Sequence, residues 1–369
     1  MRAGRHFLLR GESLRAIIEG IPAGYDIIGP VREKWAVNLA VLDSADDLSL
    51  NSRSEESPGR YRLRDENAGP GEARPMNSAK SFTHRARETL YRARLDEDRQ
   101  WQYRPAAAPK VKQAFFGLHA CDIAGMSVMD RTFNKRFRDA QYDRRRQHTI
   151  VIGVDCFEPG ENCFCSTFNA GPTLTNGFDL GLSRFGDEYL VEIATDMGAR
   201  IMNDVDLKPA HRDMLELRKK RAASARAGMV RAFDLKQAVK VLNKNYEHPY
   251  WFEVSERCLS CANCINVCPT CYCYQILDKS NLALTETARV RQWDACQNLD
   301  FAAVHGGNFR PNRADRIRQW VNHKLNWTIE QYGCAGCVGC GRCITWCPTA
   351  IDITEPVRRL GGKEIKLVA

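Results

Sequence analysis

The sequence has no long apolar run, no nucleotide-binding motif and no cysteine among its first 120 residues. No stretch approaches the roughly 18 apolar residues of a membrane-spanning helix, so we expect no membrane partner. Residues 1–20 are too charged for a secretory signal, which favours a cytoplasmic protein. The G-x-G-x-x-G fingerprint, the P-loop and the G-x-S-x-G elbow are all missing. The sequence therefore shows no motif for a substrate site of its own.

The cysteines are concentrated late in the chain, where twelve of the sixteen follow residue 255. Without an export signal, disulfides are not expected, because cytosolic thiols are kept reduced. Structural cysteines of a hydrophobic core would be scattered along the sequence. The clustering therefore predicts metal or cluster ligands.

The formal net charge of +9 suggests nucleic acid or an acidic surface as a partner. Each [4Fe–4S] cluster with its four thiolates adds a charge of about −2. Two clusters would leave the chain at about +5, and four would leave it at about +1. The positive net charge of the chain can therefore compensate the negative charge of bound clusters, and we expect no nucleic-acid partner.

Two cysteine runs share the pattern C-x2-C-x2-C-x3-C-P, one ending at Pro269 and the other at Pro348. Three thiolates at every third residue surround one cubane, and the fourth binds the other cluster of a pair. The spacing predicts two [4Fe–4S] clusters, held by Cys258, Cys261, Cys264 and Cys347 and by Cys337, Cys340, Cys343 and Cys268. Zinc is the alternative, but its C-x2-C pairs do not explain a third cysteine at the same spacing.

Eight further cysteines lie outside these runs and form two groups. The first group follows strand-like segments, where loops gather ligands from distant parts of a chain. It predicts a third cluster at Cys121, Cys156, Cys163 and Cys165, with buried reduced thiols as the alternative. The second group predicts a possible fourth cluster at Cys271, Cys273, Cys296 and Cys334. Asp294 could replace Cys334 as a ligand.

Three other residues near the cysteines have simpler interpretations. A lone His119 beside a strand is more often a packed or surface residue than a ligand. Trp293 and Trp346 are interpreted as hydrophobic lids that keep water from a cluster and so influence its potential.

Apolar periodicity divides the chain into an α/β part and a cysteine-rich part. Strand-like runs occur at 113–119, 148–156 and 188–196, with helix candidates at 82–100 and 124–140. Residues 51–80, rich in Ser, Arg, Gly and Pro, are expected to be an irregular connection.

The expected fold class is α+β. We expect an α/β domain at 1–205, a basic connecting helix at 206–250 and an α-helical ferredoxin-like dicluster domain at 251–369. Cys268 and Cys337 are 69 residues apart, and the insert between them looks mainly helical. That favours the helical kind of ferredoxin domain over the compact bacterial kind.

Longer segments around the cysteines resemble a known family. They include "HPYWFEVSERCLSCANCINVCPTCYCY", "RQWDACQNLDF", "CVGCGRCITWCP", "FFGLHACDIAGMSVMDRTF" and "VDCFEPGENCFCSTFNAGP". The chain resembles the iron–sulfur β subunit of cytoplasmic NiFe sulfhydrogenases and the closely related subunit of anaerobic sulfite reductase. The resemblance covers most of residues 80–355, is loose over the first 75 residues, and does not supply Cys334.

The resemblance implies an electron relay without catalysis of its own. In that family, a flavin- and NAD(P)-binding subunit exchanges electrons with this one. Electrons then pass to a small iron–sulfur subunit and a catalytic subunit, or to a sulfite-reducing subunit. The sequence leaves the identity of the catalytic partner open.

Two other functions are weighed against the relay. A free-standing reductase would need a cluster with an open iron site beside an acid such as Asp122 or Glu158. A structural metal-binding adaptor, for example on nucleic acid, would contain zinc and show no visible absorbance. Purification of the chain alone separates the three, because a relay shows reversible reduction without turnover.

Overall fold

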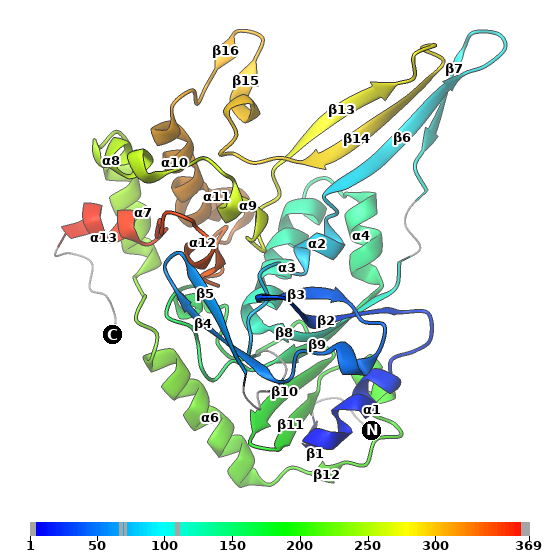
Figure 1. Ribbon diagram of the computed structural model, residues 1–369, viewed down its shortest axis with the longest axis vertical. Coiled ribbons are helices and arrows are strands. Elements are labelled where there is room, and N and C mark those ends of the chain that lie inside the picture. The colour runs from blue at the N-terminus through cyan, green and yellow to red at the C-terminus, as the bar shows by residue number, and fades with distance from the viewer. Residues whose placement is uncertain (1–4, 66–68, 70–71, 108–110, 363–369) are drawn as a thin grey trace.

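The computed structural model describes residues 5–65, 69, 72–107 and 111–362 (Figure 1). The expected domain at 1–205 therefore begins before the first described residue, and the expected domain at 251–369 continues past the last one. Residues 66–68 and 70–71 of the expected connection also lie outside them. The chain has a mixed α/β architecture with two large sheets.

An eight-stranded sheet forms the centre of the first part, in the order β12-β1-β11-β10-β9-β8-β2-β3. Its middle strands β10, β9, β8 and β2 are parallel, and the outer pairs are antiparallel. All seven residues of β8 are buried, as expected for a parallel strand covered on both faces. The strands are β1 Arg5–Arg10, β2 Asp26–Glu33, β3 Ala36–Val41, β8 Gln113–His119, β9 Thr149–Val154, β10 Leu180–Phe185, β11 Glu188–Ile193 and β12 Lys208–Pro209. The three strand-like runs are thus confirmed.

Helices cover both faces of this sheet. Successive side chains of β8 point to opposite faces, so Phe115 packs in one core with Ile123, and Phe116 in another with Ile17. The helices of these two layers are α1 Leu14–Glu19, α3 Ala120–Asn134, α4 Ala140–Gln147 and α5 Asp196–Ile201. The expected helix at 124–140 corresponds to α3 and the start of α4.

A second sheet, with the order β13-β14-β6-β7, projects from the body as an arm (Figure 1). Its strands are β6 Arg87–Leu95, β7 Trp101–Pro105, β13 Tyr274–Ser280 and β14 Glu286–Trp293. The expected helix at 82–100 is therefore wrong, because only α2 (Lys80–Thr83) precedes β6. The expectation of a mainly helical insert is also wrong over β13 and β14. Pairing between β6 and β14, distant in sequence, outweighs local propensity here.

The connection expected at 51–80 contains a hairpin, β4 (Ser52–Ser57) with β5 (Arg60–Asp65). β4 reads SRSEES and β5 reads RYRLRD, so only two apolar side chains mark the period of two. Gly59 forms the turn with φ of 71°, a conformation that suits glycine. Its N–H donates to the Ile344 carbonyl at 3.0 Å, so the hairpin tip lies against the second cysteine run.

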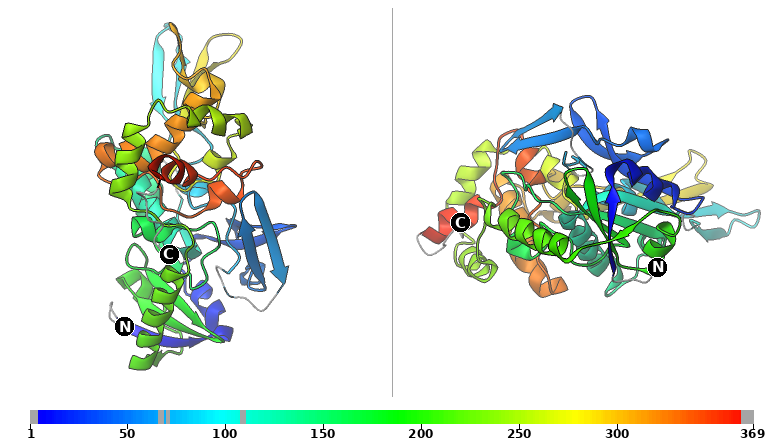
Figure 2. Two further views of the ribbon diagram at one scale, coloured as in Figure 1. Left: turned by 90° about the vertical axis from the view of Figure 1, so that its left-hand side faces the viewer. Right: turned by 90° about the horizontal axis from the view of Figure 1, so that it is seen from below.

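Of the remaining helices, α6 (Arg212–Ala227) lies beside the eight-stranded sheet, and the others surround the two cysteine runs above that sheet in the upright views (Figures 1 and 2). The others are α7 Leu235–Lys244, α8 Tyr250–Arg257, α9 Asn263–Asn266, α10 Arg313–Asn322, a π-helical segment His323–Trp327, α11 Thr328–Tyr332, α12 Arg342–Thr345 and α13 Glu355–Gly361. The basic helix expected at 206–250 is in fact two helices. Asp234 begins the second one by accepting a hydrogen bond from the Gln237 N–H.

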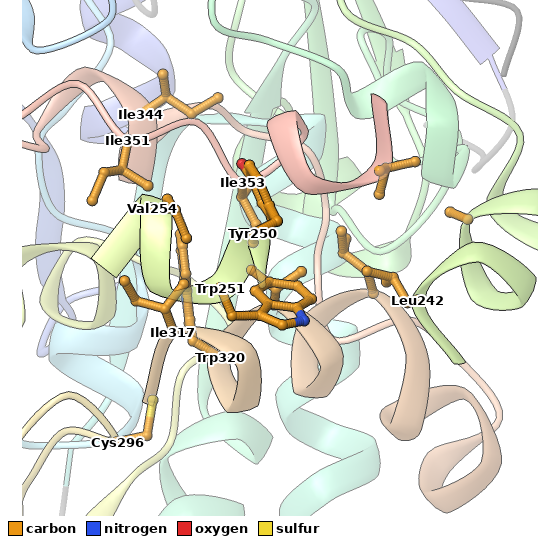
Figure 3. Close-up of a cluster of buried hydrophobic side chains, with 14 of the residues drawn as sticks. Leu242, Tyr250, Trp251, Val254, Cys296, Ile317, Trp320, Ile344, Ile351 and Ile353 are labelled. Atoms are coloured by element: carbon orange, nitrogen blue, oxygen red, sulfur yellow. The ribbon is translucent and has the colours of Figure 1, made fainter. Parts of the chain in front are cut away.

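Trp251, Trp320, Leu242 and Ile317 form the centre of the core between these helices (Figure 3). Cysteines of both runs pack against this core. It therefore fixes the position of the two cysteine loops relative to each other.

Candidate metal centres

The first cavity is ringed by thiols from both cysteine runs. Cys258, Cys261 and Cys264 line it together with Cys347 of the second run, around a volume of about 30 Å³. Ile317, Trp320 and Ile351 supply apolar walls. This is the grouping that crossed ligation requires.

A second cavity, of about 20 Å³, is ringed by the other four thiols of the runs, Cys268, Cys337, Cys340 and Cys343. Phe164, Val338 and Trp320 close it with apolar surface. Cys264, Cys343 and Trp320 line both cavities, so the two lie next to each other.

The two cysteine loops have the same backbone geometry. Ser260 and Ala262 have φ of 52° and 64°, and Gly339 and Gly341, at equivalent positions, have 65° and 76°. The N–H groups of Ser260 and Gly339 donate to the sulfurs of Cys258 and Cys337, both at 3.3 Å. Turns of this kind direct successive amides into a concave site for negative charge. Both loops are therefore built to stabilise thiolates.

The donor chemistry of the two cavities fits iron–sulfur clusters. All eight ring atoms of the runs are thiols, the ligands that such clusters take, and apolar side chains line both cavities. Within the described part of the chain, no three His, Cys, Asp or Glu side chains converge closely enough to hold a single ion. The thiols are spread around the cavities instead.

The structure also gathers the third predicted group of cysteines. Cys121 lies in the first turn of α3 and Cys156 follows β9. Cys163 lies in the next loop, and Cys165 begins the short 3-10 helix Cys165–Phe168. Cys165 lies within electrostatic range of Cys163 and Cys156, and Cys121 within range of Cys165. Burial raises the pKa of all four thiols, that of Cys156 to about 12.

This third group adjoins the second cavity. The Cys163 thiol donates to the Cys340 carbonyl at 3.8 Å. Cys165, Cys121 and Cys340 also share one apolar cluster with Val338. The second cavity therefore lies between the first cavity and the third group.

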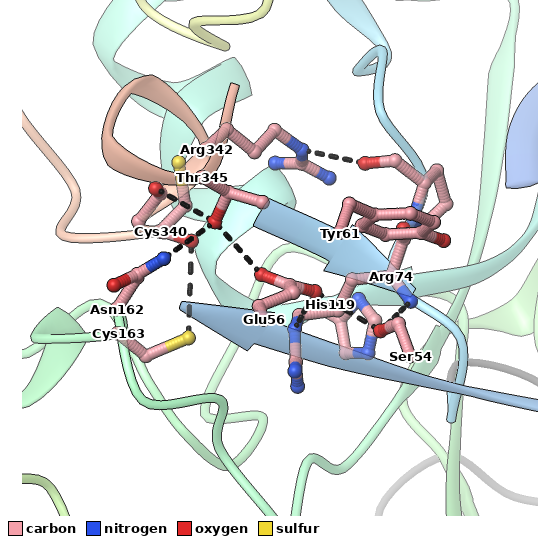
Figure 4. A network of polar contacts seen from close by, with 12 residues as sticks. Ser54, Glu56, Tyr61, Arg74, His119, Asn162, Cys163, Cys340, Arg342 and Thr345 are labelled. Atoms are coloured by element: carbon pink, nitrogen blue, oxygen red, sulfur yellow. Dashed lines mark hydrogen bonds and ion pairs between the residues drawn. The ribbon is translucent and has the colours of Figure 1, made fainter. Parts of the chain in front are cut away.

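A buried polar network joins the β4–β5 hairpin to both neighbouring cysteine segments (Figure 4). Thr345, on α12, donates to Glu56 at 3.1 Å and accepts from Asn162 at 2.9 Å. Arg74 Nε donates to Glu56 at 2.7 Å, and the guanidinium of Arg74 lowers the pKa of Cys163, opposing the effect of burial. The network thus places a positive charge beside the third group.

Asp122 and Glu158, the acids that a free-standing reductase would use, are engaged in ion pairs. Asp122 is buried 2.8 Å from Arg342, whose Nε also donates to the Pro75 carbonyl at 2.9 Å. Glu158 is half exposed and pairs with Arg53. His119 is buried, 3.9 Å from Asp122. Both acids are therefore already engaged with arginines, which disfavours that function.

The fourth predicted group is only partly assembled. A hydrogen bond from Cys271 lowers the pKa of Cys268 well below its usual range, although burial opposes the shift. A hydrogen bond from Cys296 lowers the pKa of Cys273 to about 7. Among the described residues, no hydrogen bond joins Cys334 to these thiols. Asp294 Oδ1 already accepts from the N–H of Ala295 at 2.7 Å and from Asn298 at 2.6 Å.

Two buried lysines beside this group were missed by the sequence analysis. Lys80 and Lys324 are each only 3% exposed, and neither forms an ion pair with a carboxylate in the described residues. Their Nζ atoms donate to the Ile265 carbonyl at 3.0 Å and to Thr270 at 2.9 Å. Buried ammonium groups require a counter-charge. The sulfurs of Cys268 and Cys271 lie within electrostatic range of both lysines; with them the pKa of Lys324 is raised despite its burial, whereas burial still lowers the pKa of Lys80.

The two tryptophans interpreted as lids occupy different surroundings. Trp346 packs against Tyr61 at 4.8 Å and Trp35 at 5.7 Å between ring centroids. Lys80 lies 4.2 Å from the ring centroid of Trp293, whose Nε1 donates to the His84 carbonyl at 3.0 Å. Their role in excluding water stays a prediction.

In the ranges that the structure describes, no helix is long and apolar enough to span a membrane.

Residues 257–351 match the family described as a 4Fe-4S dicluster domain. Over 334 residues the chain is 29% identical to the sulfhydrogenase 2 subunit beta of Pyrococcus furiosus, a match that covers 88% of this chain and 89% of that relative. No solved structure matches the chain significantly. The dicluster match supports iron–sulfur clusters as the cofactor of the two cysteine runs. The resemblance to iron–sulfur beta subunits that the cysteine segments indicate is thereby confirmed.

Proposed function

We propose that this chain is the iron–sulfur electron-transfer subunit of an oxidoreductase complex. It relays electrons between a flavin- and NAD(P)-binding subunit and a catalytic subunit, of NiFe hydrogenase or sulfite reductase type. A small iron–sulfur subunit is a further proposed partner. A cytoplasmic location stays a prediction.

One observation carries this proposal: two adjacent cavities are lined by the eight thiols of both cysteine runs, and two of these thiols line both cavities. The first would hold a [4Fe–4S] cluster by Cys258, Cys261, Cys264 and Cys347, and the second by Cys337, Cys340, Cys343 and Cys268. When bound, such clusters supply reversible electron transfer at a potential set by hydrogen bonds, charge and exposure.

The residues around the cavities suit a relay that extends from the surface inward. Cys261 is exposed, whereas the thiols of the second cavity are only partly exposed and closed in by Phe164 and Trp320. The shared lining by Cys264 and Cys343 keeps the two sites in direct contact. Apolar side chains line both cavities, and the thiols of the second are less exposed to water than Cys261 of the first.

We further propose that the third group, Cys121, Cys156, Cys163 and Cys165, holds another cluster next to Cys340. The counter-charge of Arg74 and the shared apolar cluster with Cys340 support this. For the fourth group we propose Cys271, Cys273 and Cys296, with Cys334 or Asp294 as the fourth ligand. Lys80 and Lys324 support a negatively charged group at this position.

The relative named sulfhydrogenase 2 subunit beta supports a multisubunit setting, since its name describes one subunit of a larger enzyme. Co-purification with a nickel protein or a sirohaem protein would identify the catalytic partner.

The function is tested on the anaerobically purified chain. We expect reversible bleaching and recovery of visible absorbance on reduction and reoxidation, without turnover of hydrogen or sulfite. About eight irons per chain would indicate the two run clusters, about twelve would add one site and about sixteen both. Zinc without visible absorbance, or turnover by the chain alone, would contradict the proposal.

A further inference from the structure

Among the described residues, the ion pairs that anchor the arm formed by β13, β14, β6 and β7 to the body lie at its base. There Arg291 pairs with Glu88 at 2.7 Å and with Asp139, and Arg145 pairs with Glu88 from α4. Further out, all five residues of β7 and six of the seven residues of β13 are exposed. Figure 1 shows this outer half extending away from both the eight-stranded sheet and the cysteine-rich helices.

A sheet exposed on both faces is unusual in a folded chain. Antiparallel sheets normally bury one face against a core, and isolated strands need such a hydrophobic face to be stable. The hairpin tip adds apolar surface, since Leu282 is fully exposed and Leu284 is 67% exposed. These features indicate a surface that another molecule covers.

One face of the arm forms a broad hollow of about 920 Å³. Several cations line it: Arg87, Arg92, Arg94, Arg104 and Lys279. Arg92 and Arg104 stand directly opposite each other on β6 and β7. Like charges at such cross-strand positions destabilise a sheet. Within the described residues, neither arginine forms an ion pair with a carboxylate, so the repulsion is not relieved inside this chain.

We propose that this basic face is a docking surface for an acidic surface of another protein subunit. A partner carboxylate between Arg92 and Arg104 would relieve their repulsion and form charge-assisted hydrogen bonds with both guanidinium groups. The apolar tip at Leu282 would add a buried contact beside this charged centre. The proposal rests on the proposed function only in taking the partner to be a subunit of the same complex.

The composition of the hollow favours a protein over nucleic acid. Three carboxylates, on Asp96, Glu97 and Glu286, line it together with the cations and would repel a phosphate backbone. The aromatic pair of the arm, Tyr91 and Tyr103 at 6.1 Å, lies at strand positions that alternate with Arg92 and Arg104 and so belongs to the opposite face. Single-stranded nucleic acid sites combine cations and stacking aromatics in one groove.

The test measures association of the full chain with its co-purifying subunits, for the parent and for the double variant Arg92→Glu/Arg104→Glu. We expect affinity at low salt to fall roughly tenfold or more, and the salt dependence of binding to weaken. Iron content and visible absorbance should be unchanged, which separates this result from a failure of the relay itself. A control with the same charge change, Lys219→Glu/Lys220→Glu on α6, should bind like the parent.

A neutral variant, Arg92→Gln/Arg104→Gln, guards against misfolding of the arm. It should weaken association while leaving the thermal melt unchanged or raised, because it removes a repulsive pair. Unchanged association in both double variants would overturn the proposal. So would a single-stranded DNA probe that binds the parent and not the variants, while subunit association stays intact.

Discussion

The first cavity differs from the inner thiol sites in how the negative charge of its sulfurs is stabilised. The inner thiol sites are the second cavity and the third and fourth cysteine groups. Around the first cavity, Cys261 is exposed and water can screen the thiolates. The neighbouring Arg313, which donates to the Cys258 carbonyl at 2.9 Å, is itself at the surface. Around the inner sites, three cations are buried, Lys80, Lys324 and Arg342, and the side chain of Arg74 is only 11% exposed.

This difference shows that where solvent cannot reach the thiolates, the protein itself must supply the compensating positive charge. A buried charge is costly unless it is paired, and losing one partner leaves the other uncompensated. The inner thiols and the buried cations therefore depend on each other. The first cavity depends mainly on its own cysteine loop and on two backbone amides. The N–H of Ser260 donates to the sulfur of Cys258, and that of Ile351 donates to the sulfur of Cys347.

Removal of iron should have the largest effect and should act on the inner region first. Chelation from the full chain should abolish amide hydrogen-exchange protection in the described residues after 250, because metal binding energy at such sites, ~10 kcal/mol or more in comparable metal domains, is largely folding energy. The eight-stranded sheet should keep its protection. A cooperative melt of the iron-free chain close to that of the loaded chain would contradict this.

Replacement of a buried cation should have the second-largest effect on stability. Lys324→Met should lower stability by about 3–5 kcal/mol, because the sulfurs around it lose their counter-charge. Denaturant unfolding of the anaerobic protein measures the change, and iron content should fall with it.

The matched control for Lys324 is Arg313→Met beside the first cavity. Solvent screens that site, so its stability should change by less than about 1 kcal/mol. Equal effects of the two substitutions would remove the distinction between the first cavity and the inner sites.

A smaller effect concerns pH and the buried His84. Burial lowers its pKa from 6.5 to about 3, with Arg291 and Lys80 acting in the same direction, and neither ring nitrogen has a hydrogen-bond partner in the described residues. Because the folded pKa is depressed, the unfolded chain binds the extra proton below about pH 6.5, and stability falls as the pH falls.

Between pH 7.5 and 5.5 the loss from His84 should be about 1 kcal/mol. His84→Leu should remove this part of the pH dependence, as measured by denaturant unfolding at several pH values. An identical pH dependence in the parent and the variant would show that His84 does not carry it.

The cysteine runs were predictable because their chemistry is encoded by local spacing. The buried strands at 113–119 and 148–156 were predictable for a similar reason, since a continuous apolar run reports burial on both faces. In both cases the information lies within a few consecutive residues.

The arm and the buried lysines were not predictable in this way. Residues 82–100 have a mixed composition that suits a helix, and only pairing with β14 makes β6 a strand. Lys80 and Lys324 belong to no motif, and their role arises from the convergence of α2 and the π-helical segment on the same thiols. Tertiary contacts decide such features, and one sequence does not show them.

Crossed ligation between the two runs is the central claim, and single substitutions test it directly. Cys261→Ser and Cys340→Ser each remove one ligand within a run and so identify the spectroscopic signal of each cluster. Cys347→Ser should then alter the same signal as Cys261→Ser, although Cys347 belongs to the second run. If Cys347→Ser altered the signal that Cys340→Ser alters and left the other intact, the crossed arrangement would be wrong.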